Sequence, residues 1–265
     1  MMLTIRHETI YRYTAPMSYT IQQLRLTPRS EPHQRIRDWR VKAPGSCHGY
    51  LDAYGNQSHI LTVNGMHDEI RIVAAGSLEV DELDRGRLDD QDTLPPLVYT
   101  VTTRLTEADA GLADFAQRHL NGRDSRAAIG LAEAITGAVS YLTGATEVTT
   151  TAQDALKLGK GVCQDHAHLF LACCHVQGIP ARYVSGYIDP GNSDHAESHA
   201  WVDVWVEDNG FTGWASIDVT HANFQNGQYC RLAIGRDYDS AAPVRGVRRG
   251  GGAESMEVHV SVDRR

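Results

Sequence analysis

Apolar and polar residues alternate along the first part of the chain, up to about residue 80, which is the pattern of half-buried β-strands. In the first run, alternate residues share one face: Leu3, Ile5, His7, Thr9, Tyr11 and Tyr13. Comparable runs follow at residues 19–26, 34–41, 59–63 and 69–74. Turn sequences such as Asn64-Gly65 separate them. Strands of this length and spacing predict an antiparallel β-sandwich-like domain over residues 1–80.

The pattern changes in the middle of the chain. Residues 81–96 are acidic, poor in apolar residues and end in two prolines, so we expect residues 81–104 to form a linker. A helical period then predicts helices over residues 110–120, 126–142 and 152–158. Strand patterns return after Pro180. This order indicates an α+β fold rather than an alternating α/β fold, with residues 105–265 as the second domain.

The C-terminal residues divide into two segments. Residues 244–252 are rich in glycine and arginine and are interpreted as a flexible surface loop. Residues 256–262 alternate again, which predicts a strand that returns to the fold.

The chain has 265 residues and a formal net charge of −8. This length suffices to bury a core without disulfides or a structural metal. Because affinity for nucleic acid depends on clustered Lys and Arg, the acidic balance argues against a nucleic-acid partner. No stretch approaches the roughly 18 apolar residues of a membrane span, and the N-terminus lacks the apolar centre of a signal peptide. We therefore expect a cytoplasmic protein without a membrane partner.

The five cysteines are an odd number, and three of them (Cys163, Cys173 and Cys174) lie within twelve positions, which is a poor layout for disulfides. A reducing compartment fits this layout better. Cys163 follows a glycine-bracketed turn and opens an apolar helical run. A helix N-terminus stabilises a thiolate and offers N–H groups to an oxyanion. Cys163 is therefore a candidate nucleophile, and the alternative is an ordinary buried cysteine.

Two later strands carry a histidine and an aspartate on the same face. His199 belongs to the alternating run 199–206, and Asp218 ends the run 214–219. If the intervening hairpin turns between Asp208 and Asn209, His199 lies directly opposite Asp218. Moving the turn by one residue makes the two residues diagonal neighbours, about 7–8 Å apart. In either register a carboxylate can orient the imidazole.

Cys163, His199 and Asp218 together have the composition of a nucleophile, a general base and an orienting group. The segments Gly161-Val162-Cys163-Gln164-Asp165, Ser198-His199-Ala200-Trp201-Val202 and 214–220 resemble the motifs of bacterial transglutaminase-like cysteine hydrolases. The resemblance implies a papain-like core behind a β-rich N-terminal region, and a thioester intermediate. One departure is Val219, where such proteins often have proline, so the turn after Asp218 is not defined by that residue.

These observations predict a cysteine hydrolase or peptidase that acts on an amide bond of a peptide or protein substrate without a cofactor. An acyltransferase that moves a glutamyl group to an amine is an alternative, and a non-catalytic binding module of the same fold is another. Tyr141, Trp201 and Trp214 are candidates for binding the substrate, although aromatic residues more often fill cores. The oligomeric state does not follow from the sequence.

The helical run after Cys163 is dense in possible metal ligands: His166, His168, Cys173, Cys174 and His175. On a helix, His166 and His168 point about 200° apart, and neighbouring residues about 100° apart. The run also lacks the CxxC and HExxH spacings of zinc sites. The sequence therefore predicts no metal site.

Overall fold

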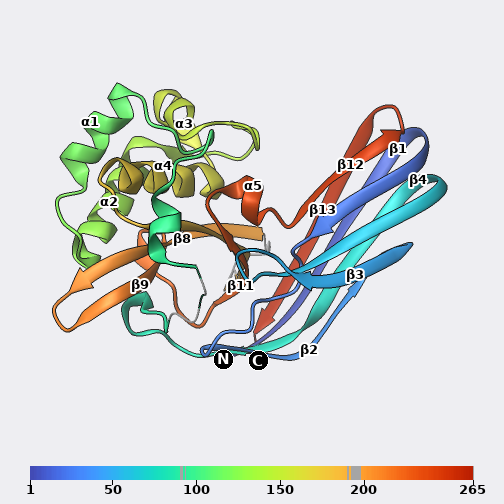
Figure 1. The fold of residues 1–265 in the computed structure, drawn as a ribbon, viewed down its shortest axis with the longest axis horizontal. Coiled ribbons are helices and arrows are strands. Elements are labelled where there is room, and N and C mark those ends of the chain that lie inside the picture. The colour runs from blue at the N-terminus through green and yellow to red at the C-terminus, as the bar shows by residue number, and fades with distance from the viewer. Residues whose placement is uncertain (90–91, 93, 190, 192–197, 265) are drawn as a thin grey trace.

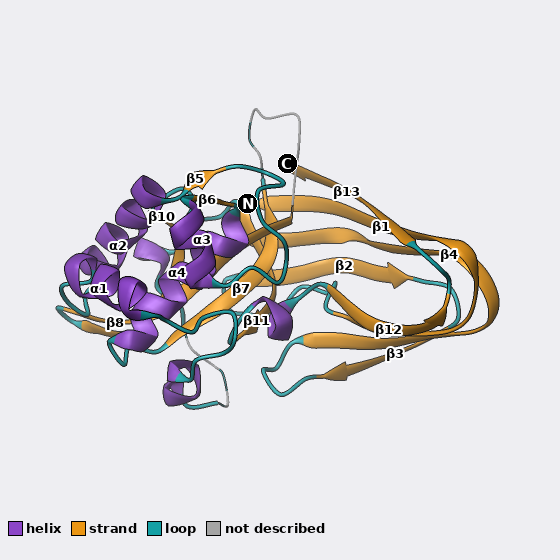
Figure 2. Ribbon diagram, turned by 90° about the horizontal axis from the view of Figure 1, so that it is seen from above, coloured by secondary structure: helices purple, strands orange, loops and turns teal. Residues whose placement is uncertain are grey.

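The structure is a computed structural model that describes residues 1–89, 92, 94–189, 191 and 198–264. A β-rich part lies beside a part in which helices cover a second sheet (Figure 1). Figure 2 shows the helices gathered at one end of the molecule and the long strands at the other. The predicted α+β class is confirmed. None of the described helices is long and apolar enough to cross a membrane.

Two long strands, β1 (Met2–Leu24) and β4 (Gln57–Val80), form the centre of the β-rich part. Their antiparallel pairing is interrupted between Arg12 and Met17. Strand β2 (Gln34–Lys42) pairs with the second half of β4, and β3 (Ser46–Leu51) pairs with its first half. Side chains from both halves of β1 and from both halves of β4 share one core, which includes Tyr11, Leu24, Leu61, Ile70 and Ile72. The predicted sandwich-like arrangement is therefore present.

The strands are longer than expected. The runs at 59–63 and 69–74 are both parts of β4, and Asn64-Gly65 lies inside that strand. Gly65 has a φ of 89°, yet Asn64 still pairs with Tyr19 of β1. The register of the two long strands shifts between Met17 and Tyr19, which is the mark of a β-bulge. A bulge bends both strands at this point, and they pair again on its other side. An alternating pattern cannot distinguish such a bend from a turn.

The C-terminal residues belong to the β-rich part, which differs from the predicted domain boundary. Strand β12 (Val244–Gly250) pairs with the second half of β1, and β13 (Glu254–Arg264) pairs with its first half. Both chain ends therefore meet at one edge of the molecule (Figure 1). Residues 244–252 were expected to be a loop. They form mostly strand because backbone hydrogen bonds to β1 need no apolar side chains.

The second part is built on a sheet with the strand order β10-β9-β8-β7-β11. These strands are β7 (Ala181–Ile188), β8 (Ser198–Asp208), β9 (Phe211–Asp218), β10 (Asn223–Phe224) and β11 (Tyr229–Gly235). Helix α4 (Cys163–Val176) packs on the face that carries Ala200, Val202 and Ile217. The opposite face carries Trp201, Asp203 and Trp214, as the alternation along β8 and β9 requires.

Three helices surround α4: α1 (Ala110–His119), α2 (Ser125–Ala138) and α3 (Ala152–Leu158). The predicted helix 126–142 ends earlier, because the chain leaves α2 and forms β5 (Ser140–Tyr141) beside β6 (Lys160–Gly161). A short helix, α5 (Tyr238–Ala241), follows β11 and leads into β12. The C-terminal strands therefore connect directly to the helical part.

The segment that was expected to be a linker packs against the core in its described residues. It contains the 3-10 turns η1 (Asp84–Gly86) and η2 (Pro96–Thr100), and Arg87 forms a β-bridge with Ala215. Tyr99 is buried with its ring centroid 5.6 Å from that of Trp214. The buried side chains of Leu88 and Tyr99 anchor a segment of otherwise polar composition. Residues 90, 91 and 93 of this prediction lie outside the described residues.

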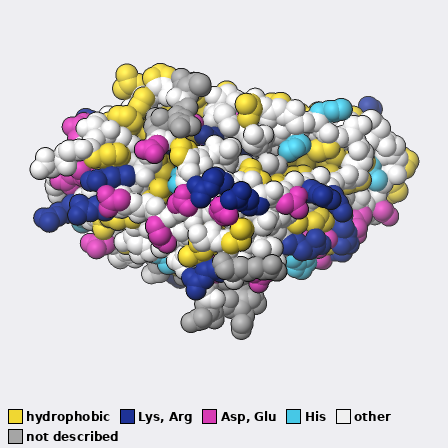
Figure 3. Space-filling view, turned by 90° about the horizontal axis from the view of Figure 1, so that it is seen from below, with side chains coloured by type: hydrophobic (Ala, Val, Ile, Leu, Met, Phe, Trp, Pro, Cys, Tyr) yellow, Lys and Arg dark blue, Asp and Glu magenta, His cyan; other side chains and the backbone are white. Residues whose placement is uncertain are grey.

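A buried ion-pair network joins the two parts of the molecule. Arg231 of β11 bonds Asp203 of β8 at 2.6 Å and Glu31 of the β-rich part at 2.9 Å. Arg182 contacts the same Asp203 carboxylate at 2.7 Å. At the surface, by contrast, Lys and Arg side chains are interspersed with Asp and Glu side chains on the face shown in Figure 3. Exposed ion pairs of the chain include Arg12–Glu69 and Arg37–Glu79.

We expect Arg231→Ala to lower the free energy of unfolding by roughly 3–5 kcal/mol, because it leaves buried carboxylates without their partner. The exposed pair Arg123–Glu207, 3.6 Å apart, provides the control, and Arg123→Ala should cost at most about 1 kcal/mol. Urea denaturation of both variants measures the difference. Equal effects of the two substitutions would show that the buried network contributes no special stability.

Candidate active site

Cys163 is the first residue of α4, and two local features start the helix there. The Asp165 carboxylate accepts hydrogen bonds from the Val162 backbone N–H at 2.8 Å and from the Thr146 hydroxyl at 2.6 Å. A Cβ on Gly161 would lie 2.8 Å from this carboxylate, so only glycine permits the close approach. The glycine-bracketed turn therefore presents Cys163 at a helix N-terminus, as the sequence predicted.

His199 and Asp218 meet through the second of the two registers considered. Asp208 pairs with Phe211, so the β8–β9 hairpin turns between Asn209 and Gly210. Gly210 has a φ of 82°, a conformation that favours glycine and explains this turn position. His199 and Asp218 become diagonal neighbours, and His199 Nε2 lies 2.7 Å from Asp218 Oδ2.

Burial and hydrogen bonding determine the charges of this pair. Burial lowers the pKa of His199, but its hydrogen bonds to Asp218 and Cys163 outweigh that effect and raise the pKa to about 10. Burial would raise the pKa of Asp218, but hydrogen bonds and positive charge from His199 and His221 hold it below its usual range. The arrangement therefore favours an imidazolium beside a carboxylate, with Cys163 as the other neighbour of the ring.

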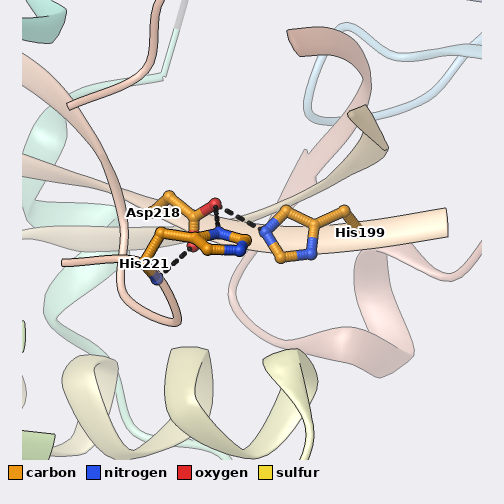
Figure 4. A group of neighbouring side chains, drawn as sticks. All are labelled: His199, Asp218 and His221. Atoms are coloured by element: carbon orange, nitrogen blue, oxygen red, sulfur yellow. Dashed lines mark hydrogen bonds and ion pairs between the residues drawn. The ribbon is translucent and has the colours of Figure 1, made fainter. Parts of the chain in front are cut away.

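Two further side chains bind Asp218, and neither was singled out from the sequence. His221 Nδ1 lies 2.7 Å from Asp218 Oδ2 (Figure 4), and the Tyr229 hydroxyl donates to the same oxygen at 2.8 Å. His221 lies three residues after Asp218, a spacing that could have identified it. Tyr229 comes from β11, and no local pattern connects it with Asp218.

Cys163 and His199 both line a cavity of about 270 Å³. Tyrosines contribute much of the remaining wall, together with small polar and apolar residues: Tyr141, Thr143, Val162, Gln164, Tyr183, Ser185, Gly186, Ser198, Ala200, Tyr238 and Pro243. Tyr141 thus lies where a substrate-binding residue would lie. Tyr183 and Tyr238 were not predicted. Pro243 immediately precedes β12, so the strand that joins the β-rich part begins at the cavity wall.

The prediction that Trp201 and Trp214 bind the substrate is wrong, because neither side chain reaches the cavity beside Cys163. Both are almost completely buried and lie in a cluster on the sheet face away from α4. Trp201 Nε1 donates to the Ser216 hydroxyl at 3.0 Å, and the Trp214 ring packs edge-on against Trp205. Neither lines the cavity. Alternation along β8 correctly places Trp201 on the same face as His199. Trp201 is two residues farther along the strand, however, and at that position its side chain does not reach the cavity.

The possible metal ligands of α4 do not converge on one point, because His166 and His168 form hydrogen bonds with different groups. His166 Nε2 lies 3.0 Å from the Val139 carbonyl oxygen, and His168 Nε2 accepts the Tyr238 N–H at 3.1 Å. Within the described part of the chain, the group that could hold a metal ion is His199, Asp218 and His221, whose ligand atoms lie within 4.8 Å of one another. These atoms already form hydrogen bonds of 2.7 Å, so a metal ion would have to replace both shared protons.

Two family models match this chain over most of its length. The bacterial transglutaminase-like N-terminal region matches residues 3–79, and the transglutaminase-like superfamily matches residues 114–219. The second match includes Cys163, His199 and Asp218. The N-terminal match corresponds to the sandwich up to the end of β4 and leaves out β12 and β13.

Known proteins resemble the chain from end to end. An uncharacterized protein of Mycobacterium leprae is 30% identical over 287 aligned positions, which cover 99% of this chain and 98% of that protein. An uncharacterized protein of Mycobacterium tuberculosis is 28% identical over 98% of this chain and 91% of its own length. The crystal structure of a candidate cysteine protease from Cytophaga hutchinsonii superposes with a TM-score of 0.80 at 21% identity, covering 99% and 90% of the two chains. The chain therefore belongs to the transglutaminase-like superfamily, with a papain-like core and a bacterial transglutaminase-like N-terminal region.

Proposed function

We propose that this protein is a cysteine hydrolase that cleaves an amide bond of a peptide or protein through a thioester on Cys163. The observation that carries the proposal is the hydrogen-bonded series in which His199 contacts both Cys163 and the buried Asp218, the latter at 2.7 Å. The cavity beside Cys163 has room for an acyl group. The likeness to the Cytophaga hutchinsonii protein supports the same reaction class through the fold alone.

The thioester forms in the first half of the reaction. The Cys163 thiolate attacks the carbonyl carbon, a C–S bond forms, and the C=O electron pair moves to the oxygen. Backbone N–H groups at the start of α4 stabilise this oxyanion. His199 Nε2 is hydrogen-bonded to Asp218. The other ring nitrogen, Nδ1, therefore donates its proton to the leaving nitrogen as the C–N bond breaks. A free amine and a thioester result.

Water completes the reaction in the second half. His199, now neutral, accepts a proton from a water molecule as its oxygen attacks the thioester carbon. The C–S bond breaks, the acid is released, and the thiolate and imidazolium are restored. Asp218 keeps the ring in place and stabilises its positive charge in both halves. An amine in place of water would give an acyltransferase with the same thioester.

The first test measures the reactivity of the cysteines toward iodoacetamide by mass spectrometry. We expect Cys163 to react roughly 100-fold faster than the other four at neutral pH, because it is a partly exposed cysteine at a helix N-terminus beside the His199 ring. Burial raises the pKa of the Cys173 thiol to about 12 and holds that of Cys174 well above its usual value. Burial likewise raises the pKa of Cys47 and Cys230. Uniformly slow labelling would contradict catalysis and favour a binding module.

The second test separates hydrolysis from acyl transfer. The protein is incubated with a glutamine-containing peptide library and methylamine, and the products are identified by mass. Cleaved peptides that depend on Cys163 support hydrolysis. Incorporation of methylamine without cleavage, again dependent on Cys163, would replace our proposal by a transglutaminase reaction.

A further inference from the structure

A second histidine holds the carboxylate that orients His199. His221 Nδ1 and His199 Nε2 both lie 2.7 Å from Asp218 Oδ2 (Figure 4). The His221 backbone N–H donates to the other carboxylate oxygen at 3.2 Å. One residue therefore contacts both oxygens of the carboxylate.

Burial distinguishes the two histidines. The side chains of Asp218 and His199 are 0% and 8% exposed, whereas that of His221 is 52% exposed. The Tyr229 hydroxyl, which comes from the buried side, completes the contacts of Asp218. The His221 side chain therefore lies between the Asp218 carboxylate and the solvent. A buried carboxylate interacts more strongly with an imidazolium than one that water can reach.

The backbone after Asp218 fixes His221 in this position. Ala222 has a φ of 49°, a left-handed conformation that is unfavourable for a residue other than glycine, and its N–H donates to the Val219 carbonyl oxygen at 3.3 Å. The Thr220 hydroxyl lies 3.1 Å from His166 Nδ1 of α4. The turn is thus attached to the helix that carries Cys163. Strain of this kind persists where the surrounding contacts require it.

We propose that His221 is a positioning residue that acts on His199 through Asp218. The hydrogen bond from its ring Nδ1 restricts rotation of the carboxylate, so that Oδ2 stays directed at His199 Nε2, and the ring itself limits access of water. His221 does not line the cavity, so it acts without touching the substrate. The inference rests on the proposed function, because it assigns a second histidine to that same site.

Three substitutions separate the hydrogen bond from the shielding. His221→Ala removes both, His221→Phe keeps a ring but has no donor, and His221→Asn places an amide N–H near the position of Nδ1. We expect the Ala and Phe variants to lose about tenfold in the rate of Cys163 alkylation by iodoacetamide and in kcat for a peptide that the wild type cleaves. KM should stay unchanged, and the Asn variant should remain within about threefold of wild type.

The exposed His259 on β13 provides the matched control, and His259→Ala should behave as wild type. Labelling of the buried Cys173 and Cys174 reports any loss of folding in each variant. Wild-type rates in both His221→Ala and His221→Phe, or equal losses in His221→Asn and His221→Phe, would overturn the proposal. If Cys163 of the wild type reacts no faster than Cys47, the proposed function itself fails, which is a different result.

Discussion

Cys163→Ala is expected to lower kcat/KM for a cleaved peptide by about 10³-fold or more, because no other group can form the thioester. The residue lies at the N-terminus of α4 and is partly exposed to the cavity, so truncating its side chain removes the reactive atom with little loss of packing. Hydrolysis is followed by mass spectrometry with the best substrate of the peptide library. The thermal unfolding temperature should change little.

Cys47→Ala is the matched control, since Cys47 is also partly buried but lies on β3 in the β-rich part. It should retain wild-type activity. If Cys163→Ala also retained activity, a different nucleophile would be required and the thioester mechanism would be wrong. In the wild type, a mass increase on Cys163 during turnover would identify the acyl-enzyme directly.

Asp218→Asn is expected to lower kcat by about 10²–10⁴-fold. The amide has nearly the same shape as the carboxylate, but it lacks the negative charge that stabilises the His199 imidazolium. Asp218 is completely buried, so this charge acts without screening by water. The exposed Asp114 on α1 provides the control, and Asp114→Asn should leave kcat unchanged.

The pH profile adds a second measurement to this variant. The pKa of His199 is raised to about 10, chiefly because the hydrogen bonds to Asp218 and Cys163 outweigh burial. The proton needed by the leaving nitrogen is therefore present below that pH and lost above it, so wild-type activity should decline as the pH rises through about 10. In Asp218→Asn the decline should begin at lower pH. An unchanged profile would show that Asp218 does not control His199.

Three residues of the candidate site, Cys163, His199 and Asp218, could be predicted from the sequence because each lies in a local pattern. The glycines before Cys163 indicate a turn into a helix, and the structure places Cys163 as the first residue of α4. Alternation put His199 and Asp218 on one strand face, and they form a hydrogen bond. The register remained open because one residue more or less in the turn preserves the faces. Gly210 decided it by adopting a positive φ.

Residues whose positions depend on distant strands could not be found in this way. Tyr229 reaches Asp218 from β11, and Tyr183 and Tyr238 reach the cavity from β7 and α5. Trp201 has the right face of β8 but lies too far along the strand to contact the cavity. Side-chain alternation specifies a face of a sheet but not a location on that face.

By itself, the sequence determined the α+β class, the sandwich-like N-terminal region, and the helix N-terminus and strand face that carry Cys163, His199 and Asp218. These features arise from periodicity and turn residues, which act over a few positions. The tertiary structure alone decided that β12 and β13 complete the sheet of β1, that described residues of the polar segment at 81–104 pack on the core, and that His221 and Tyr229 hold Asp218. A local pattern such as the alternation at 256–262 predicts a strand, but it does not specify which strand or side chain that element contacts, because these contacts form by pairing and burial in the folded chain.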